Sequence, residues 1–158
     1  MKMKILLLLI LTIYQSSNYQ TFSQQKPSLK GFTIGAKIGN QVNNKMTTVG
    51  GVNGFLYVET LNDGTIYSIV FIPAISENEQ LKMTINEVES LKKKFENNFS
   101  IYYKKKDEKP KEPIYHTYQN MISYSIYHNR NATLFSIVDI VGSGKANIQK
   151  QEKDKRDF

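Results

Sequence analysis

Two histidines, His116 and His128, are the side chains in this sequence best suited to hold a metal ion or to act as a general base. If a hairpin turned at Gln119-Asn120, His116 would lie opposite Ser123, and His128 would follow five residues further along that strand. At ~3.4 Å per residue the two rings would then be about 17 Å apart, too far to share a metal ion. Neither ring has a serine or an acid at a spacing typical of a catalytic triad, so we expect no catalytic residue and no metal ligand here.

Three acidic residues lie near the ends of predicted strands: Glu59, Asp63 and Asp139. Paired carboxylates are the machinery of many enzymes that cleave polysaccharides, so a carboxylate-dependent hydrolase acting on envelope polymers is one alternative function. Glu59 and Asp63, however, flank an Asn-Asp-Gly turn whose own chemistry accounts for these acids. The sequence therefore favours a protein that is not an enzyme.

The segment Gly142-Ser143-Gly144-Lys145 matches only the end of a phosphate-binding loop. The full motif needs a glycine five positions before Gly144 and a serine or threonine after Lys145, but these positions hold Asp139 and Ala146. The sequence also has no cysteine, which excludes disulfides, thiolate metal sites and a lipidated cysteine. We therefore expect no bound cofactor.

Tyrosine and lysine are concentrated in one stretch of the chain, at Tyr102, Tyr103, Tyr115, Tyr118, Tyr124, Tyr127, Lys104, Lys105, Lys106, Lys109 and Lys111. In a strand over Met121–His128, side-chain alternation assigns Tyr124 to the more apolar side and leaves Tyr127 exposed. Exposed tyrosines often anchor protein interfaces. The predicted partner surface comprises Tyr115, Tyr118, Tyr127, Lys104, Lys105 and Lys106. The competing interpretation is that aromatic residues simply favour strands and that half of these tyrosines are core.

The formal net charge is +7, and Arg130 and Arg156 are the only arginines among the basic residues. Sequence-specific recognition of nucleic acid depends largely on the planar guanidinium group. A lysine-rich surface instead suits solvation or weak attraction to anions. We therefore expect no specific nucleic-acid binding, and weak polyanion binding stays as a second alternative function.

Residues 1–23 have the pattern of a cleavable signal peptide. Lys2 and Lys4 precede an apolar run over Ile5–Ile13, which is too short to span a bilayer of ~30 Å. Thr21-Phe22-Ser23 puts small residues at the −3 and −1 positions, so we expect cleavage after Ser23. The sequence thus predicts a periplasmic or secreted protein that does not span the membrane once the signal is removed.

Strands predicted in the first half of the chain position Glu59 and Asp63. Alternation of apolar and polar residues predicts a strand over Gly31–Gly39, and the polar segment Asn40–Thr48 is typical of a loop. Runs rich in β-branched and aromatic residues over Val52–Leu61 and Thr65–Ile72 predict a hairpin in which Gly64 supplies a positive φ. We expect Pro73 to end the second strand.

One amphipathic helix is predicted from Ile85 to about Asn98. Thr84 and Glu87 have the spacing of a capping box, in which the threonine caps the first turn and the glutamate reaches back. The apolar stripe expected to face the sheet comprises Ile85, Val88, Leu91, Phe95 and Phe99.

The remaining segments predict a meander. They are a strand leaving the helix over Phe99–Tyr103, an exposed loop over Lys104–Pro113, strands over Ile114–Tyr118, Met121–His128 and Thr133–Val141, and a polar stretch over Lys145–Phe158 that is a frayed helix or a disordered tail.

The predicted fold class is therefore α+β, with a mostly antiparallel sheet of about six strands, a hairpin followed by a meander, and one helix packed on one face. The predicted organisation is a signal peptide at 1–23, a single domain at 24–143 and a charged tail at 144–158. The function expected from these features is that of a small exported, non-enzymatic binding protein whose partner is another protein or an envelope component.

Overall fold

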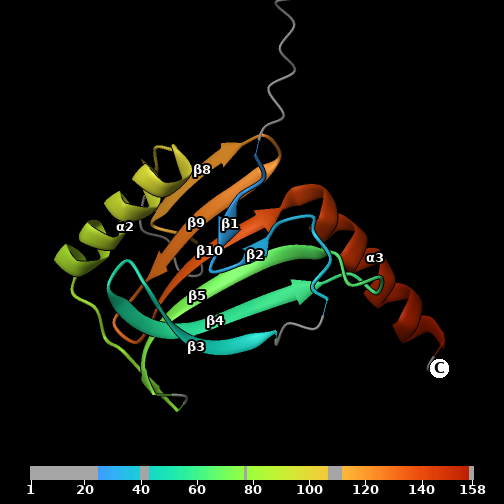
Figure 1. Ribbon diagram of the computed structural model, residues 1–158, viewed down its shortest axis with the longest axis horizontal. Coiled ribbons are helices and arrows are strands. Elements are labelled where there is room, and N and C mark those ends of the chain that lie inside the picture. Colours follow the sequence, from blue (N-terminus) through green and yellow to red (C-terminus); the bar gives the residue numbers. More distant parts are fainter. Residues whose placement is uncertain (1–24, 40–42, 77, 107–111, 157–158) are drawn as a thin grey trace, which may run out of the picture.

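The protein, in a computed structural model that describes residues 25–39, 43–76, 78–106 and 112–156, is an antiparallel sheet with two helices (Figure 1). The strands are β1 (Ser28–Leu29), β2 (Phe32–Thr33), β3 (Asn44–Val49), β4 (Val52–Thr60), β5 (Ile66–Ser76), β6 (Glu79–Gln80), β7 (Lys104–Lys105), β8 (Tyr115–Gln119), β9 (Ile122–His128) and β10 (Thr133–Asp139); the helices are α2 (Ile85–Phe99) and α3 (Ile140–Arg156). β1 pairs with β2 in a small separate sheet, and the main sheet has the order β3-β4-β5-β10-β9-β8-β7, with β6 paired to β5. The predicted α+β class is confirmed, with more strands than expected.

The hairpin of β4 and β5 forms as predicted, with Gly64 at a φ of 79° in its turn. β5 does not end at Pro73, however, but continues to Ser76. The carbonyl oxygen of Pro73 accepts a hydrogen bond from Leu81 N–H, so the proline nitrogen faces that edge and not β4. The pairing of β10 with β5 reaches only Phe71. The N–H group that Pro73 lacks would therefore have no partner in β4 or β10, so the proline costs β5 no backbone hydrogen bond to either strand.

The first part of the sheet differs from the prediction. The segment expected to be a strand over Gly31–Gly39 contains only β2 and an isolated bridge between Lys37 and Thr65, because Gly31, Gly35 and Gly39 all have positive φ. Extended chain cannot run through such residues.

The polar segment expected to be a loop over Asn40–Thr48 contains edge strand β3 instead. β3 pairs with β4 through a turn at Gly50 and Gly51, whose φ values of 57° and 82° suit a two-residue hairpin. An edge strand tolerates polar side chains that an internal strand would not, which is why the polar composition was misleading.

Helix α2 begins at the predicted capping box. Thr84 N–H donates to Glu87 Oε2 at 2.7 Å, and Thr84 Oγ1 accepts from Glu87 N–H. The stripe of Val88, Leu91 and Phe95 is buried, but Ile85, expected to belong to it, is 49% exposed. Position 85 is the first residue of the helix and lies beyond the edge of the core.

The core lies between α2, the β1–β2 hairpin and one face of the main sheet. The Phe95 ring stacks on Phe135 of β10 with centroids 5.0 Å apart, and Phe99, which is half-buried, contacts Tyr124 of β9 at 5.6 Å. We call the sheet surface that faces α2 the α2 face and the opposite surface the open face.

Two connections after α2 also differ from expectation. The predicted strand over Phe99–Tyr103 is absent, because Ser100 ends the helix in the left-handed conformation, and strand β7 forms instead inside the segment expected to be an exposed loop. The β8–β9 turn lies at Asn120-Met121, both with positive φ, and not at Gln119-Asn120. The rest of the predicted loop, residues 107–111, lies outside the described residues.

Helix α3 replaces the predicted end of the last strand and the polar tail. β10 ends at Asp139, whose Oδ1 accepts hydrogen bonds from the N–H groups of Val141 and Gly142 and so starts the helix. Gly142 and Gly144, which the sequence placed in an incomplete phosphate-loop motif, lie inside α3, so the described part of the chain has a second helix. Of the two interpretations of the tail, the helical one is correct as far as Arg156. None of the helices in the described part of the chain is long and apolar enough to cross a membrane.

Candidate functional site

The open face is formed by alternate residues of the seven strands that run across the main sheet. Cross-strand pairing places one row of side chains across it, comprising Lys104, His116, Ser125, Ser136, Val70, Tyr57 and Asn44. A second row comprises Tyr118, Ser123, Val138, Ser68 and Glu59, and further open-face positions are Tyr127, Leu134, Ile72, Phe55 and Met46. Helix α3 approaches the sheet near its start, where Gly142 lies against Tyr67, and its Gln149 side chain accepts a hydrogen bond from Asn62 N–H between β4 and β5.

Tyr118 and Tyr127 lie on this open face and reach solvent, with exposed fractions of 64% and 37%. Tyr57 and Met46 are also exposed on the same face. The sequence reasoning therefore located two of its three tyrosines at the surface.

Tyr115 does not belong to that surface. It pairs with Ile126 of β9 and faces α2, where it is buried. Tyr115 and Tyr118 are three positions apart, and side chains an odd number of positions apart in a strand point to opposite faces. The prediction that Tyr115 could join the exposed group is wrong for this reason.

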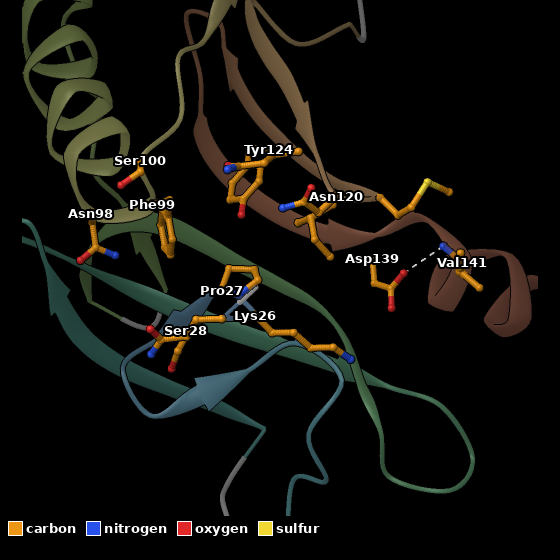
Figure 2. A pocket seen from close by; sticks show the side chains of 14 residues that line it. Lys26, Pro27, Ser28, Asn98, Phe99, Ser100, Asn120, Tyr124, Asp139 and Val141 are labelled. Atoms are coloured by element: carbon orange, nitrogen blue, oxygen red, sulfur yellow. Dashed lines mark hydrogen bonds between the residues drawn. The ribbon is translucent and has the colours of Figure 1, made fainter. Parts of the chain in front are cut away.

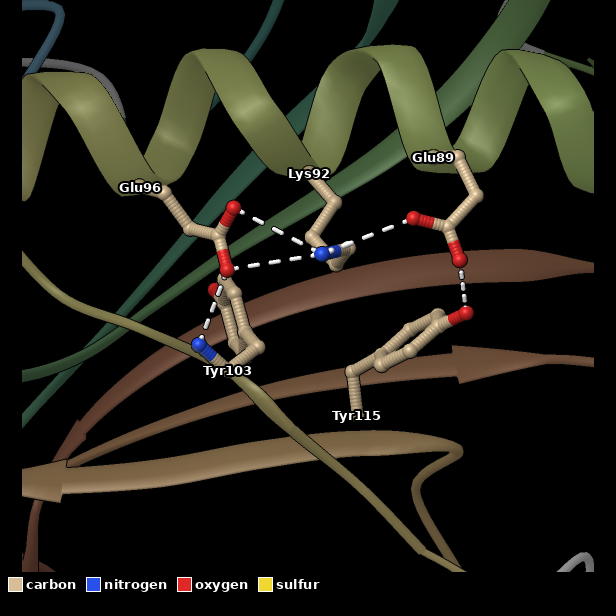
Figure 3. Close-up of polar contacts among 5 residues, drawn as sticks. All are labelled: Glu89, Lys92, Glu96, Tyr103 and Tyr115. Atoms are coloured by element: carbon tan, nitrogen blue, oxygen red, sulfur yellow. Dashed lines mark hydrogen bonds and ion pairs between the residues drawn. The ribbon is translucent and has the colours of Figure 1, made fainter.

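A polar network holds Tyr115 against α2 (Figure 3). Its hydroxyl donates to Glu89, and this hydrogen bond holds the pKa of the Glu89 carboxyl below its usual range. Lys92 lies between Glu89 and Glu96, 3.4 Å from an oxygen of each, with its ammonium 5.1 Å from the centre of the Tyr115 ring. Glu96 in turn accepts from Tyr103 N–H at 2.9 Å. The network fastens the segment after α2 and strand β8 to the helix.

The predicted lysines divide between the two faces. Lys104 pairs with His116 and lies on the open face, whereas Lys105 pairs with Tyr115 and lies on the α2 face. Lys106 is exposed, and its charge contributes to lowering the pKa of His116. The three lysines therefore do not form one continuous basic surface.

His116 forms a cluster that the sequence reasoning missed. Ser123 Oγ lies 3.4 Å from His116 Nε2, and the Tyr118 ring meets the imidazole edge-on with centroids 4.0 Å apart. Burial, followed by the charge of Lys106, lowers the pKa of His116, so the ring is neutral at pH 7. The sequence reasoning placed Ser123 directly opposite His116, whereas in the observed register Ser123 pairs with Tyr118 and reaches His116 diagonally. The contact with the Tyr118 ring was not anticipated.

The other polar candidates are engaged in contacts of their own. His128 Nδ1 lies 2.9 Å from Thr133 Oγ1. Asp63 forms an ion pair with Lys37 that holds its pKa well below the usual range, and Asp139 caps α3. Burial, and after it the nearby carboxylate of Glu59, raises the pKa of the Tyr67 hydroxyl. Among the described residues, no three His, Asp or Glu side chains are grouped closely enough to hold a metal ion.

A cavity of about 670 Å³ lies on the α2 face, beyond the C-terminal end of α2 (Figure 2). It is bounded by the lead-in to β1, the end of α2, the β8–β9 turn and the start of α3. Tyr124 lies at its wall, and burial raises the pKa of this tyrosine to about 12. Sequence inspection could not locate this cavity, because the four segments that bound it are separated along the chain and meet only in the folded protein.

Comparison with known proteins gives no relationship: no protein-family model, no curated protein and no solved structure matches this chain.

Proposed function

We propose that this protein is an exported, non-enzymatic binding protein of the cell envelope that engages a partner protein through the open face of its sheet. The proposal of export rests on the signal-like sequence of residues 1–23, which lie outside the described residues. The proposal of binding rests on one observation, the pair of exposed tyrosines, Tyr118 and Tyr127, on a face that α2 does not cover.

Exposed tyrosines on a sheet are well suited to protein contacts. Each offers a rigid ring and a hydroxyl group, so it buries a large area at little cost in side-chain entropy. Between Tyr118 and Tyr127 the open face carries the small side chains of Ser123 and Ser125. A broad partner surface can therefore contact both rings and the backbone between them.

A protein is favoured over a small ligand as the partner on this face. Two cavities in the described part of the chain lie elsewhere: one at the end of α2, and one of about 460 Å³ between α2 and β1. Small-molecule sites are usually concave, whereas protein interfaces are broad and carry a few aromatic anchors.

The alternative functions receive less support. A carboxylate-dependent hydrolase would need two converging acids, one with a raised pKa, but Asp63 is paired with Lys37 and its pKa is lowered. Asp139 and Glu59 lie on opposite faces of the sheet. A polyanion-binding protein would present a continuous lysine surface, whereas Lys104 and Lys105 point in opposite directions.

Photo-crosslinking in the native envelope tests the proposal. A benzoyl-phenylalanine introduced at Tyr118 or at Tyr127 is expected to give the same protein adduct. The matched control is Tyr102, which is 86% exposed in the segment after α2 and outside the open face. Equal adducts from all three positions, or none from the open face, would contradict the proposal.

A partner identified in this way allows a quantitative test. The double variant Tyr118→Ala, Tyr127→Ala is expected to bind the purified partner at least ~30-fold more weakly, as for truncated interface anchors. Tyr102→Ala should leave the affinity unchanged. An unchanged affinity of the double variant would exclude the open face as the interface.

Export has its own test. Intact-mass measurement of the protein recovered from its native host is expected to give a chain that begins at Gln24. A full-length species found in the cytoplasm would refute export without bearing on the binding surface.

A further inference from the structure

The cavity at the end of α2 is lined by the hydroxyl group of a largely buried tyrosine, Tyr124. The Tyr124 side chain is only 4% exposed, and among the described residues its hydroxyl group makes no hydrogen bond. In Figure 2 the ring stands beside Phe99 with its hydroxyl directed into the cavity. Tyr115, the comparable buried tyrosine of the same sheet face, donates to Glu89. The Tyr124 hydroxyl is thus available to a molecule in the cavity.

Neutral polar groups surround this hydroxyl. The side chains of Asn98 and Ser100 reach the cavity from the end of α2, and Asn120 reaches it from the β8–β9 turn. Amide and hydroxyl groups both donate and accept hydrogen bonds. The wall can therefore bind a ligand that both donates and accepts at several points.

The two charged residues that line the cavity, Lys26 and Asp139, make contacts with other parts of the protein. Asp139 uses Oδ1 to accept the N–H groups of Val141 and Gly142. The Lys26 side chain lies along Gly35, so closely that a Cβ there would meet its ammonium. Neither charge is placed as the main contact for an ionic ligand.

An apolar patch completes the wall. The Phe99 ring is half-buried and contacts the Tyr124 ring at 5.6 Å, and Ile122 and Met121 lie beside it. Sugar rings have an apolar face of C–H groups as well as hydroxyl groups at their rim. A cavity of about 670 Å³ falls within the usual range for small-molecule sites.

We propose that this cavity binds a neutral, hydroxyl-rich ligand of the size of a small saccharide, with the Tyr124 hydroxyl as its most buried contact and Asn98, Ser100 and Asn120 at its rim. This site lies on the α2 face, whereas the proposed partner surface lies on the open face. A result that contradicts one proposal therefore does not contradict the other.

The test is a nuclear magnetic resonance titration of the ¹⁵N-labelled protein lacking residues 1–23. The probes are glucose and N-acetylglucosamine, and putrescine serves as a cationic probe, each up to about 50 mM because small ligands often bind with millimolar affinity. We expect at least one sugar to shift the amide signals of Asn98, Ser100 and Asn120 in a saturable way. If neither sugar shifts these signals, or if putrescine shifts them and the sugars do not, the proposal is wrong.

The variant Tyr124→Phe removes only the hydroxyl group. It is expected to weaken binding of that sugar about fivefold, the value of one neutral hydrogen bond. Tyr103→Phe is the matched control, because Tyr103 is a half-buried tyrosine of the same region that does not line the cavity. The spectrum of each variant reports whether it is folded. If the folded Tyr124→Phe variant binds the sugar as tightly as the wild type, the hydroxyl is not a ligand contact and the proposal fails.

Discussion

Helices α2 and α3 both pack beside the same sheet but are held there in different ways. α2 buries Val88, Leu91 and Phe95 in the core and begins at a capping box. α3 is longer, yet it lies against Tyr67 through Gly142 and accepts a hydrogen bond from Asn62 N–H at Gln149, while Ile148 is 57% exposed. Most helical stability in proteins comes from packing an apolar face. Helix α2 therefore contributes to the stability of the core, whereas α3 depends on the sheet without contributing much to the core.

The largest effect that tests this comparison is expected from Phe95. Phe95→Ala should lower the free energy of unfolding by about 3 to 5 kcal/mol, because it opens a cavity between α2 and Phe135. Ile148→Ala on α3 should change it by no more than ~0.5 kcal/mol. Urea titration of both variants measures the difference. Similar losses would mean that α3 is as integral to the core as α2.

A smaller effect is expected at the start of α2. Thr84→Ala removes the side-chain oxygen that accepts from Glu87 N–H, and should cost about 1 kcal/mol of stability in the same titration. Thr84→Ser keeps a hydroxyl group at the cap and should retain most of the stability. If both variants lose the same amount, the methyl group of the threonine matters more than the cap.

The smallest effects concern two glycines of α3. At Gly144 an added Cβ meets nothing within 4 Å, so Gly144→Ala should stabilise the helix by roughly 0.5 to 1 kcal/mol. At Gly142 an added Cβ would lie 2.6 Å from Tyr67 Cβ, so the same gain in propensity is opposed by a clash with the sheet.

The readout for this pair is helical circular dichroism together with amide hydrogen exchange in α3. We expect Gly144→Ala to raise protection and Gly142→Ala to lower it. Increased protection in both variants would show that α3 does not need its close approach to Tyr67.

The sequence predicted those elements whose signals are local. The capping box at Thr84, the turn at Gly64 and the strand pattern of Met121–His128 each depend on residues a few positions apart, and all three are present. β3 was missed because its polar residues lack an apolar period. α3 was predicted only as one of two interpretations of the tail, with its start placed too late, because its residues also lack a clear apolar period. β3 requires β4 as its partner, and α3 requires the cap at Asp139.

The candidate site was predicted only in part for the same reason. Alternation along a strand separates Tyr124 from Tyr127 whatever the pairing, and that assignment is confirmed by their burial and exposure. Which residues face one another depends on the turn. Placing it at Asn120-Met121 sets His116 opposite Ser125 instead of Ser123, and nothing in the single sequence distinguishes the two registers.

The two edges of the main sheet both carry lysine. At one edge, Lys45 of β3 points onto the α2 face with its ammonium 4.7 Å from the centre of the Phe32 ring; at the other, β7 consists of Lys104 and Lys105. An unpaired edge strand is a template on which a second copy of a chain can add, and repeated addition leads to fibres. A copy joined edge to edge would bring these ammonium groups together at the strand spacing of about 5 Å. The lysines at the edges therefore disfavour the edge-to-edge addition of further copies of the chain.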